Sequence, residues 1–273
     1  MSSDRSKKSL VNNMQLFYHF GNKHLARTRI LPFLLPLLKD ADEYREPFVG
    51  AGAIALSVMS RYPNMQCWIN DLDPAIAALW RSAKEFPDEL TDRVQNFEPN
   101  VPDFRAFSTA IDEIDTLPES PAAIIELGFQ QLGVATMRWA GHGGSPRGGY
   151  GQKYPRIGER WSRDWLIDKL TLISERLNAA NIRITGADFA ALIEDTNRRA
   201  VIFLDPPYFN SGGNYRYDFR HADHRRLAAL LRQTPHPWVL TYHDCPEVRR
   251  LYAWATIAGV YAETLVIHPT RLR

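Results

Sequence analysis

The sequence predicts an α/β protein with a parallel or mostly parallel sheet. Short runs of apolar and β-branched residues alternate with segments of helical spacing, as expected when strands are buried on both faces. Most of these runs end at Gly, Pro or Asp, which commonly follow a buried strand. A chain of 273 residues can form one large domain or a core domain that carries a smaller insertion.

The predicted elements follow from the spacing of apolar residues. Strands are expected at 46–49, 66–70, 182–185, 200–204, 238–242 and 263–267. Helices are expected at 53–61, 74–86, 164–180 and 222–233, where apolar positions recur three and four residues apart.

Residues 87–163 interrupt this alternation. The window 81–126 contains four Lys/Arg against eleven Asp/Glu, whereas the window 138–165 contains six against two. The second window is rich in Gly and aromatic residues, a composition suited to a mobile loop, and it could face an anion such as a phosphate backbone. A solvated surface is the alternative. We therefore predict that 1–86 and 164–273 form the core domain and that 87–163 is inserted into it.

Composition also bears on location and metal content. The longest apolar run, 30–38, is too short to span a membrane and contains two prolines, and the polar N-terminus does not resemble a secretory signal. Cys67 and Cys245 match neither a disulfide framework nor a zinc site, and His221 and His224 lack a third ligand. We expect a cytoplasmic protein with no membrane segment and no metal.

The turn at 46–52, Glu-Pro-Phe-Val-Gly-Ala-Gly, is the first motif that suggests a ligand. Gly50 and Gly52 permit a tight turn with close approach of the backbone to a ligand, although a purely structural turn would need the same residues. Asp71 follows 21 residues after Gly50, where doubly wound folds place a carboxylate that accepts ribose hydroxyls. Helix capping by Asp71 or Asp73 is the alternative.

A nucleoside without phosphates fits this turn better than a dinucleotide. The third glycine of the dinucleotide fingerprint is absent, and no Gly-Lys-Ser/Thr loop is present. S-adenosylmethionine is such a nucleoside, and its carboxylate requires a cation or amide donors. Lys23, in Gly21-Asn22-Lys23, is the candidate cation.

The strand at 200–204 ends in Asp205-Pro206-Pro207-Tyr208, at the edge where open α/β sheets place their sites. An aromatic amine is a poor nucleophile because its lone pair is delocalised into the ring. If the Asp205 carboxylate and the Pro206 carbonyl each accept one N–H, the lone pair can point at a sulfonium methyl group. Consecutive prolines hold such acceptors rigidly, and Tyr208 offers a stacking face for a flipped base.

These motifs, in this order, resemble the Dam-type DNA N6-adenine methyltransferases. That family pairs a Phe-x-Gly-x-Gly loop, here Phe48 to Gly52, with an Asp-Pro-Pro-Tyr loop. The resemblance extends over most of the chain. It implies a doubly wound, Rossmann-like methyltransferase sheet, mostly parallel with one antiparallel strand, and an inserted target-recognition domain between Asp73 and Asp188.

The resemblance also implies roles for particular residues. His19 and Lys23 would bind the methionine end of the cofactor, although family members often have an aromatic residue at the position of His19 and a glycine at that of Asn22. Asp71 would bind the ribose, Asp188 and Phe189 would lie near the cofactor adenine, and Asp205 would serve both substrate and cofactor.

Duplex DNA is the expected partner, with no membrane and no obligate protein partner. We expect contacts from the basic stretch with Arg138, Arg147, Lys153 and Arg156, and from Tyr215 in a flexible loop, 211–217, that could close over the flipped base or be only a surface loop. A separately encoded restriction enzyme is a further expected partner.

Three alternatives stay open. The same acceptors could bind the exocyclic amine of cytosine, or that of adenine in RNA. In cytosine enzymes, however, Ser is commoner than Asp at the position of Asp205. A nicotinamide-dependent oxidoreductase could use Gly50 and Asp71 but leaves Asp205 to Tyr208 unexplained. An inactive DNA-binding relative is the third possibility, and the intact Lys23, Asp71 and Asp205 argue against it.

Overall fold

A seven-stranded sheet forms the centre of the molecule, in the order β3-β2-β1-β4-β5-β7-β6. The computed structural model describes residues 26–139, 142–154, 156–209, 212–260 and 263–267. The strands are β1 Glu43–Glu46, β2 Gln66–Asn70, β3 Ile182–Thr185, β4 Ala200–Leu204, β5 Trp238–Tyr242, β6 Thr256–Val260 and β7 Glu263–Ile267. Strands β1 to β5 pair in parallel, and β7 runs antiparallel to both β5 and β6. The predicted mostly parallel sheet with one antiparallel strand is confirmed.

The first strand lies earlier in the chain than expected. The sequence placed it at 46–49, but β1 ends at Glu46. Pro47 has no N–H to continue a ladder, so Phe48 and Val49 belong to the turn that follows. The charged residues of β1 concealed it, because Glu43 and Arg45 are buried in spite of their charge.

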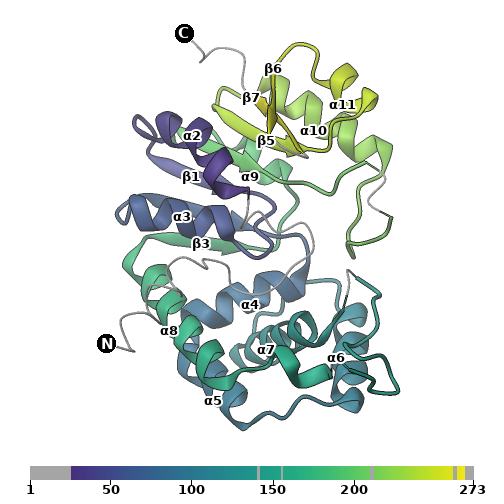
Figure 1. Cartoon of the computed structure of the whole chain (residues 1–273). Helices are drawn as coiled ribbons and strands as arrows, with labels where there is room; N and C mark the ends of the chain where they lie inside the picture. The colour runs from purple at the N-terminus through teal and green to yellow at the C-terminus, as the bar shows by residue number, and fades with distance from the viewer. Residues whose placement is uncertain (1–25, 140–141, 155, 210–211, 261–262, 268–273) are drawn as a thin grey trace.

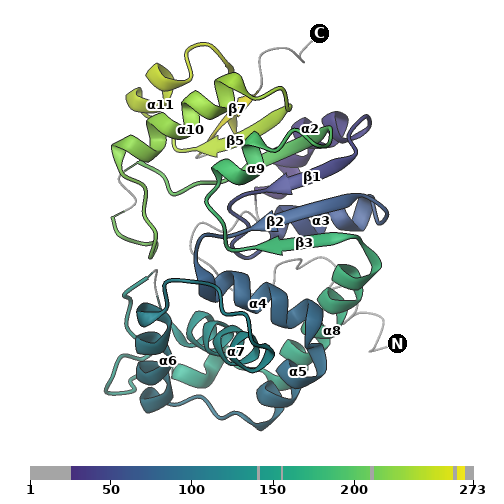
Figure 2. The ribbon, with the colours of Figure 1, turned by 180° about the vertical axis from the view of Figure 1, so that it is seen from behind.

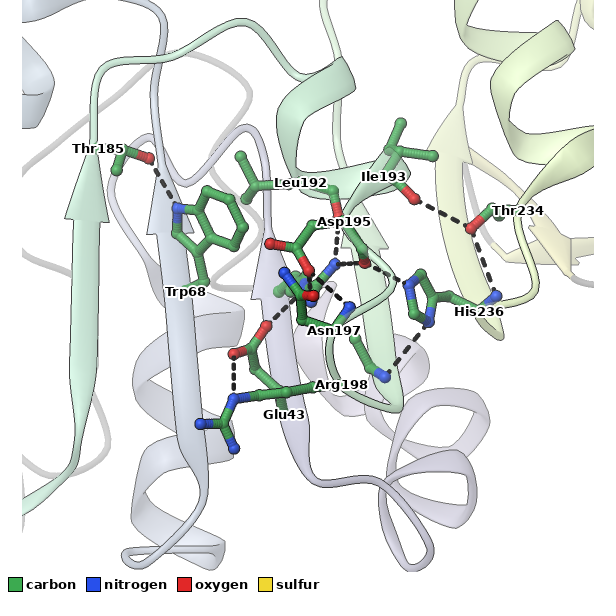
Figure 3. A network of polar contacts seen from close by, with 12 residues as sticks. Glu43, Trp68, Thr185, Leu192, Ile193, Asp195, Asn197, Arg198, Thr234 and His236 are labelled. Atoms are coloured by element: carbon green, nitrogen blue, oxygen red, sulfur yellow. Dashed lines mark hydrogen bonds and ion pairs between the residues drawn. The ribbon is translucent and has the colours of Figure 1, made fainter.

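The buried charges of β1 have partners on the neighbouring segments. Arg45 donates to Glu43 and to the main-chain carbonyls of Leu192 (2.7 Å) and Asp195 (2.6 Å). The Asp195 carbonyl also accepts from His236 Nε2 at 2.8 Å, and Figure 3 shows Glu43, Asp195 and His236 in this network. The Ala200 N–H donates to His236 Nδ1 at 3.3 Å, so the ring is neutral, and burial lowers its pKa. These contacts satisfy charges whose burial alone would destabilise the fold.

Helices cover both faces of the sheet (Figure 1, Figure 2). Within β4, Val201 and Phe203 pack into a core with α2 and α3, whereas Ile202 and Leu204 pack into a second core with α9, α10 and α11. Alternate residues of β4 therefore face opposite cores, as expected of a doubly wound sheet with helices on both faces. The helices are α2 Arg27–Leu38, α3 Ala53–Arg61, α4 Pro74–Glu85, α8 Arg163–Ala179, α9 Ala190–Glu194, α10 His221–Gln233 and α11 Pro246–Leu251.

The segment between α4 and α8 is mostly helical, which its composition did not predict. It contains α5 Pro87–Asn96, α6 Val101–Glu113, α7 Pro121–Met137 and the short 3₁₀ helix η1 Ile157–Arg160. These elements lie beyond the β3 edge of the sheet (Figure 1) and pack on α4, α8 and one another. Gly128 lets α7 approach α4 closely, since a Cβ there would lie 2.4 Å from Ser82 Oγ.

Candidate active site

One cavity of about 260 Å³ opens at the carboxyl ends of the central strands. Residues that follow β1, β2, β3 and β4 reach it, at the edge where open α/β sheets bind ligands. Of the predicted site residues, it is lined by Phe48, Gly50, Gly52, Asp71, Asp188, Phe189, Asp205, Pro207, Arg138 and Tyr215. His19 and Lys23 lie outside the described residues.

The glycine turn after β1 is shaped by its two glycines and by one tryptophan. Gly50 and Gly52 have φ angles of 46° and 71°, in the left-handed region that favours glycine. A Cβ on Gly52 would lie 2.3 Å from the ring of Trp80, which is fully buried in α4. Trp80 Nε1 donates to the Gly50 carbonyl at 2.9 Å. Sequence reasoning missed Trp80 because it occupies an ordinary apolar position of a helix.

The two acidic residues after β2 have separate roles. Asp73 caps α4, since its Oδ1 accepts from the Ala75 N–H at 3.0 Å. Asp71 instead accepts from the N–H groups of Gly50 (2.9 Å) and Asp73 (3.0 Å), which joins the glycine turn to the end of β2. Burial raises the pKa of Asp71 to about 7. A buried carboxyl at this position can accept further hydrogen bonds from ligand hydroxyls.

Asn70, the last residue of β2, joins three segments beneath the cavity. Its side-chain amide donates to the carbonyls of Pro47 (3.0 Å) and Ala187 (2.9 Å). Its Oδ1 accepts from Thr185 Oγ1 (2.6 Å) and from the Ala187 N–H (2.8 Å). The loops that carry Phe48 and Asp188 are therefore positioned by one buried side chain.

Asp188 is held in place by an arginine from α10. Arg226 donates to both Asp188 carboxylate oxygens, at 2.9 and 2.6 Å, and the Ala190 N–H donates to Oδ1 at 2.9 Å. Partial burial raises the pKa of Asp188, but these hydrogen bonds outweigh it and keep the pKa below its usual value.

Aromatic rings lie beside this carboxylate. The rings of Phe48, Phe189 and Phe219 form a triangle with centroids 5.5 to 5.7 Å apart, and the Arg226 guanidinium lies 4.8 Å from the Phe189 centroid. Such a cluster offers apolar faces to a planar ligand next to a carboxylate that can accept from an amine.

The Asp-Pro-Pro-Tyr segment follows β4 and brings Asp205 and Pro207 to the cavity. Asp205 Oδ1 accepts from Thr241 Oγ1 at 2.6 Å and from the Tyr208 hydroxyl at 3.0 Å. Tyr208 is 8% exposed, and its ring packs on Tyr242, with centroids 5.6 Å apart. Pro206 and Tyr208 are not among the residues that line the cavity, so in this conformation the Tyr208 ring faces the core.

The loop after the Asp-Pro-Pro-Tyr segment joins the catalytic edge to the inserted helices. Arg216 donates to the carbonyls of Asp112 (2.9 Å) and Ile114 (2.6 Å) at the end of α6. The His142 N–H donates to the Asn214 carbonyl at 2.8 Å. Arg216 and Asn214 both line the cavity, so its wall is built from the two parts of the chain. The sequence predicted a loop here but not its hydrogen bonds to α6 and to His142.

The four basic residues expected to contact DNA differ in exposure. Arg138 lines the cavity and is half-buried, whereas Lys153 and Arg156 are exposed. Arg147 is only 7% exposed; it pairs with Glu159 at 3.3 Å. Arg147 is therefore engaged within its own loop in this conformation, and its expected phosphate contact stays a prediction.

Carboxyl groups outnumber basic groups on the cavity wall. Glu46 lies at the end of β1, accepts from the Tyr44 hydroxyl and is 2% exposed. Burial raises the pKa of Glu46 well above its usual value, and the charges of Asp205 and Asp71 add to this. Among the described lining residues, seven are Asp or Glu, whereas the basic ones are two Arg and one His. Because a nearby positive charge favours the ionised form of a carboxyl, a ligand with a positive charge and several hydroxyls fits this wall.

The described ranges contain no candidate for a metal centre or for a membrane-spanning helix. No group of three or more His, Cys, Asp or Glu is arranged to hold a metal ion. In the same parts of the chain, no helix is both long and apolar enough to cross a bilayer.

Comparison with known proteins gives the family. Residues 20–263 match the D12 class N6 adenine-specific DNA methyltransferases. The chain belongs to this family. It is therefore a site-specific adenine DNA methyltransferase, as the motifs predicted.

Two relatives agree with this assignment. The Type II methyltransferase M1.LlaDCHI of Lactococcus lactis subsp. cremoris is 22% identical, over 83% of this chain and 81% of its own length. The Type II methyltransferase M.MjaIII of Methanocaldococcus jannaschii is 23% identical, over 70% of this chain and 69% of its own length. Among solved structures, an rRNA methyltransferase of Streptomyces viridochromogenes covers 92% of this chain and 86% of its own, at 14% identity and a TM-score of 0.40, too distant to bear on function.

Proposed function

We propose that this methyltransferase uses S-adenosylmethionine to methylate the N6 amine of an adenine turned out of duplex DNA. One observation supports this most strongly: Gly50, Asp71 and Asp205, which follow three different strands, share a single cavity. When bound, S-adenosylmethionine supplies a methyl group activated by a positively charged sulfur. The acidic wall fits that charge.

Residues of this chain would hold the cofactor at both ends. The buried Asp71 carboxyl would accept the ribose hydroxyls beside the Gly50 turn. Asp188, fixed by Arg226, would accept from the amine of the cofactor adenine, with Phe189 and Phe48 against the ring. His19 and Lys23 would bind the methionine end.

Asp205 and Pro206 would prepare the target amine. The Asp205 carboxylate accepts one N–H and the Pro206 carbonyl accepts the other, so that the nitrogen lone pair leaves the ring plane and points at the methyl carbon. With the cofactor bound, this lone pair would attack its methyl carbon, and the sulfur would leave with the electrons of the carbon–sulfur bond. The nitrogen then releases one proton to Asp205 or water. Tyr208 would stack on the flipped base once its ring turns toward the cavity.

The inserted region 87–163 would recognise the target sequence. Its Arg138 and His142 reach the cavity, and its exposed Lys153 and Arg156 would neutralise phosphates near it. Tyr215 would contact the extruded base from the opposite loop. Because both of these relatives are named as Type II methyltransferases, a separately encoded restriction enzyme is the expected partner. A cytoplasmic location stays a prediction.

The test is transfer of a labelled methyl group from S-adenosylmethionine to duplex DNA, followed by identification of the modified base. We expect N6-methyladenine, and we expect Asp205→Ala to lower kcat by about 100- to 1000-fold because one acceptor of the amine is lost. Tyr208→Ala should also lower kcat strongly, because the flipped base loses its stacking face. Asp244→Ala, which removes an exposed carboxylate paired with Arg249 on the surface, is the matched control and should leave kcat unchanged. Methylation of cytosine or RNA alone, or undiminished transfer by Asp205→Ala, contradicts the proposal.

A further inference from the structure

Strand β5 is fully buried and contains two hydroxyl groups, those of Thr241 and Tyr242. Thr241 is 0% exposed, and its neighbours Leu240 and Tyr242 are equally buried. A buried hydroxyl destabilises a protein unless it finds a hydrogen-bond partner. Thr241 finds that partner in the Asp205 carboxylate, at 2.6 Å, while its contact with the Leu204 carbonyl is longer, 3.3 Å. A hydroxyl can donate only one proton, so Thr241 donates it to the Asp205 carboxylate, which is the nearer and the stronger acceptor.

A second donor reaches the same carboxylate oxygen. The Tyr208 hydroxyl lies 3.0 Å from Asp205 Oδ1, which Thr241 also contacts. Thr241 is fixed by the strand that bears it, and in this conformation the Tyr208 ring packs on Tyr242 and His243, at 5.6 and 4.6 Å between centroids. Two donors from separate segments therefore fix the rotation of this carboxylate about its side-chain bonds.

The two donors are not equivalent during the proposed reaction. Tyr208 would turn toward the cavity to stack on the flipped base, and its hydroxyl bond to Asp205 would then change. Thr241 cannot move in this way, because it lies within a buried strand that pairs with β4 and β7. The bond from Thr241 is the one that persists when the base is bound.

We propose that Thr241 is a positioning residue for methyl transfer, which holds one oxygen of Asp205 so that the carboxylate is oriented toward the target amine. This inference rests on the proposed role of Asp205. Without the hydroxyl, the carboxylate can rotate, and fewer complexes present the amine in the reactive geometry. Because Thr241 lies behind Asp205 and not on the cavity wall, its loss should affect the chemical step and leave binding of either substrate intact.

The test compares Thr241→Val with Thr241→Ser in the full-length protein. Val has nearly the shape of Thr but no donor, whereas Ser keeps the hydroxyl. We expect Thr241→Val to lower single-turnover methylation by about 10- to 100-fold, a size typical of misplaced reacting groups, with KM for DNA and Kd for S-adenosylhomocysteine unchanged. Thr241→Ser should recover most of the rate. Thr234→Val is the control, because the buried Thr234 hydroxyl donates to the Ile193 carbonyl away from the site.

The outcomes are distinguishable. A Thr241→Val rate equal to the original rate overturns the inference, and so do equal losses in the Val and Ser variants together with a lower Tm, which indicate a packing role. If Thr241→Val does not fold, Thr241→Cys replaces it, with a weak donor of similar volume and the same expected direction. If the unaltered protein makes no N6-methyladenine, the proposed function fails before Thr241 is tested.

Discussion

At the scale of single residues, the cavity depends on side chains that bond to more than one loop. Asn70 is the most connected of them, since its amide group makes four hydrogen bonds to three other residues, Pro47, Thr185 and Ala187. The backbone of a loop lacks the regular hydrogen bonds of a helix or a sheet, so its N–H and C=O groups need side-chain partners. Buried backbone groups without a partner destabilise the fold.

Asn70→Ala should therefore reduce stability markedly. The change leaves the Ala187 N–H and the Pro47 carbonyl without their partner, and we expect the free energy of unfolding to fall by about 2–3 kcal/mol. Urea denaturation measures it. Asn178→Ala is the control, because Asn178 also donates to a backbone carbonyl, that of Lys84, but is exposed on α8. We expect this variant to lower the free energy of unfolding by less than about 0.5 kcal/mol. Equal losses in the two variants would contradict this role of Asn70.

The sequence predicted those site residues whose type and position are unusual. Gly50 and Gly52 stood out as a turn, Asp71 by its spacing from that turn, and Asp205 by its prolines, and all four line one cavity. Thr241, Trp80 and Arg226 were not predicted. Each fits the apolar or charged pattern of an ordinary strand or helix, and its role arises from segments that are distant in the sequence and meet only in the fold.

At the scale of elements, periodicity located those helices and strands whose pattern is regular. Helix α3 has the predicted bounds, and α4, α8 and α10 begin and end within one residue of theirs. Helix α2 was not predicted because it contains Pro32 and Pro36, and burial of Ile30 and Leu34 compensates for the backbone bonds that these prolines cannot make. Strand β1 was misplaced because its charges are buried in a network that is not visible in the sequence.

Helix α8 contains a lysine in an unfavourable environment. Lys169 is 3% exposed, with its Nζ 4.3 Å from the Trp165 centroid. Burial lowers its pKa from the usual value to about 7. Between about pH 7 and pH 10, the Lys169 amine is therefore protonated in the unfolded chain but not in the folded chain. The free-energy cost of burying Lys169 grows as the pH falls from about 10 to about 7, and it stays constant below about pH 7.

Lys169→Met should therefore stabilise the protein. We expect the variant to unfold at a higher temperature than the original at pH 7, by an amount equivalent to about 1–3 kcal/mol, with a smaller difference at pH 9.5. Thermal unfolding at the two pH values measures this. Lys39→Met, at an exposed lysine after α2, should give a small difference that does not depend on pH. A loss of stability in Lys169→Met at pH 7 would show that the buried charge is compensated.

At the scale of the whole molecule, the cavity lies where the sheet and the inserted helices meet. Arg216 and Asn214 come from the loop after β4, and they bond to α6 and to His142 of the inserted region. The sequence predicted that 87–163 interrupts the core, from its charge and composition. It could not predict that this region is largely helical or that it completes the cavity wall, because these features depend on tertiary packing against α4 and α8.

The central claim is that one cavity at the carboxyl edge of the sheet holds the cofactor beside Asp205. A crystal structure with S-adenosylhomocysteine tests it most directly. We predict ribose hydroxyls within hydrogen-bond distance of Asp71, the adenine ring against Phe48 and Phe189 with its amine at Asp188, and the sulfur facing the Asp205 side of the cavity. A ligand bound elsewhere, or bound here with its sulfur turned away from Asp205, would contradict the claim.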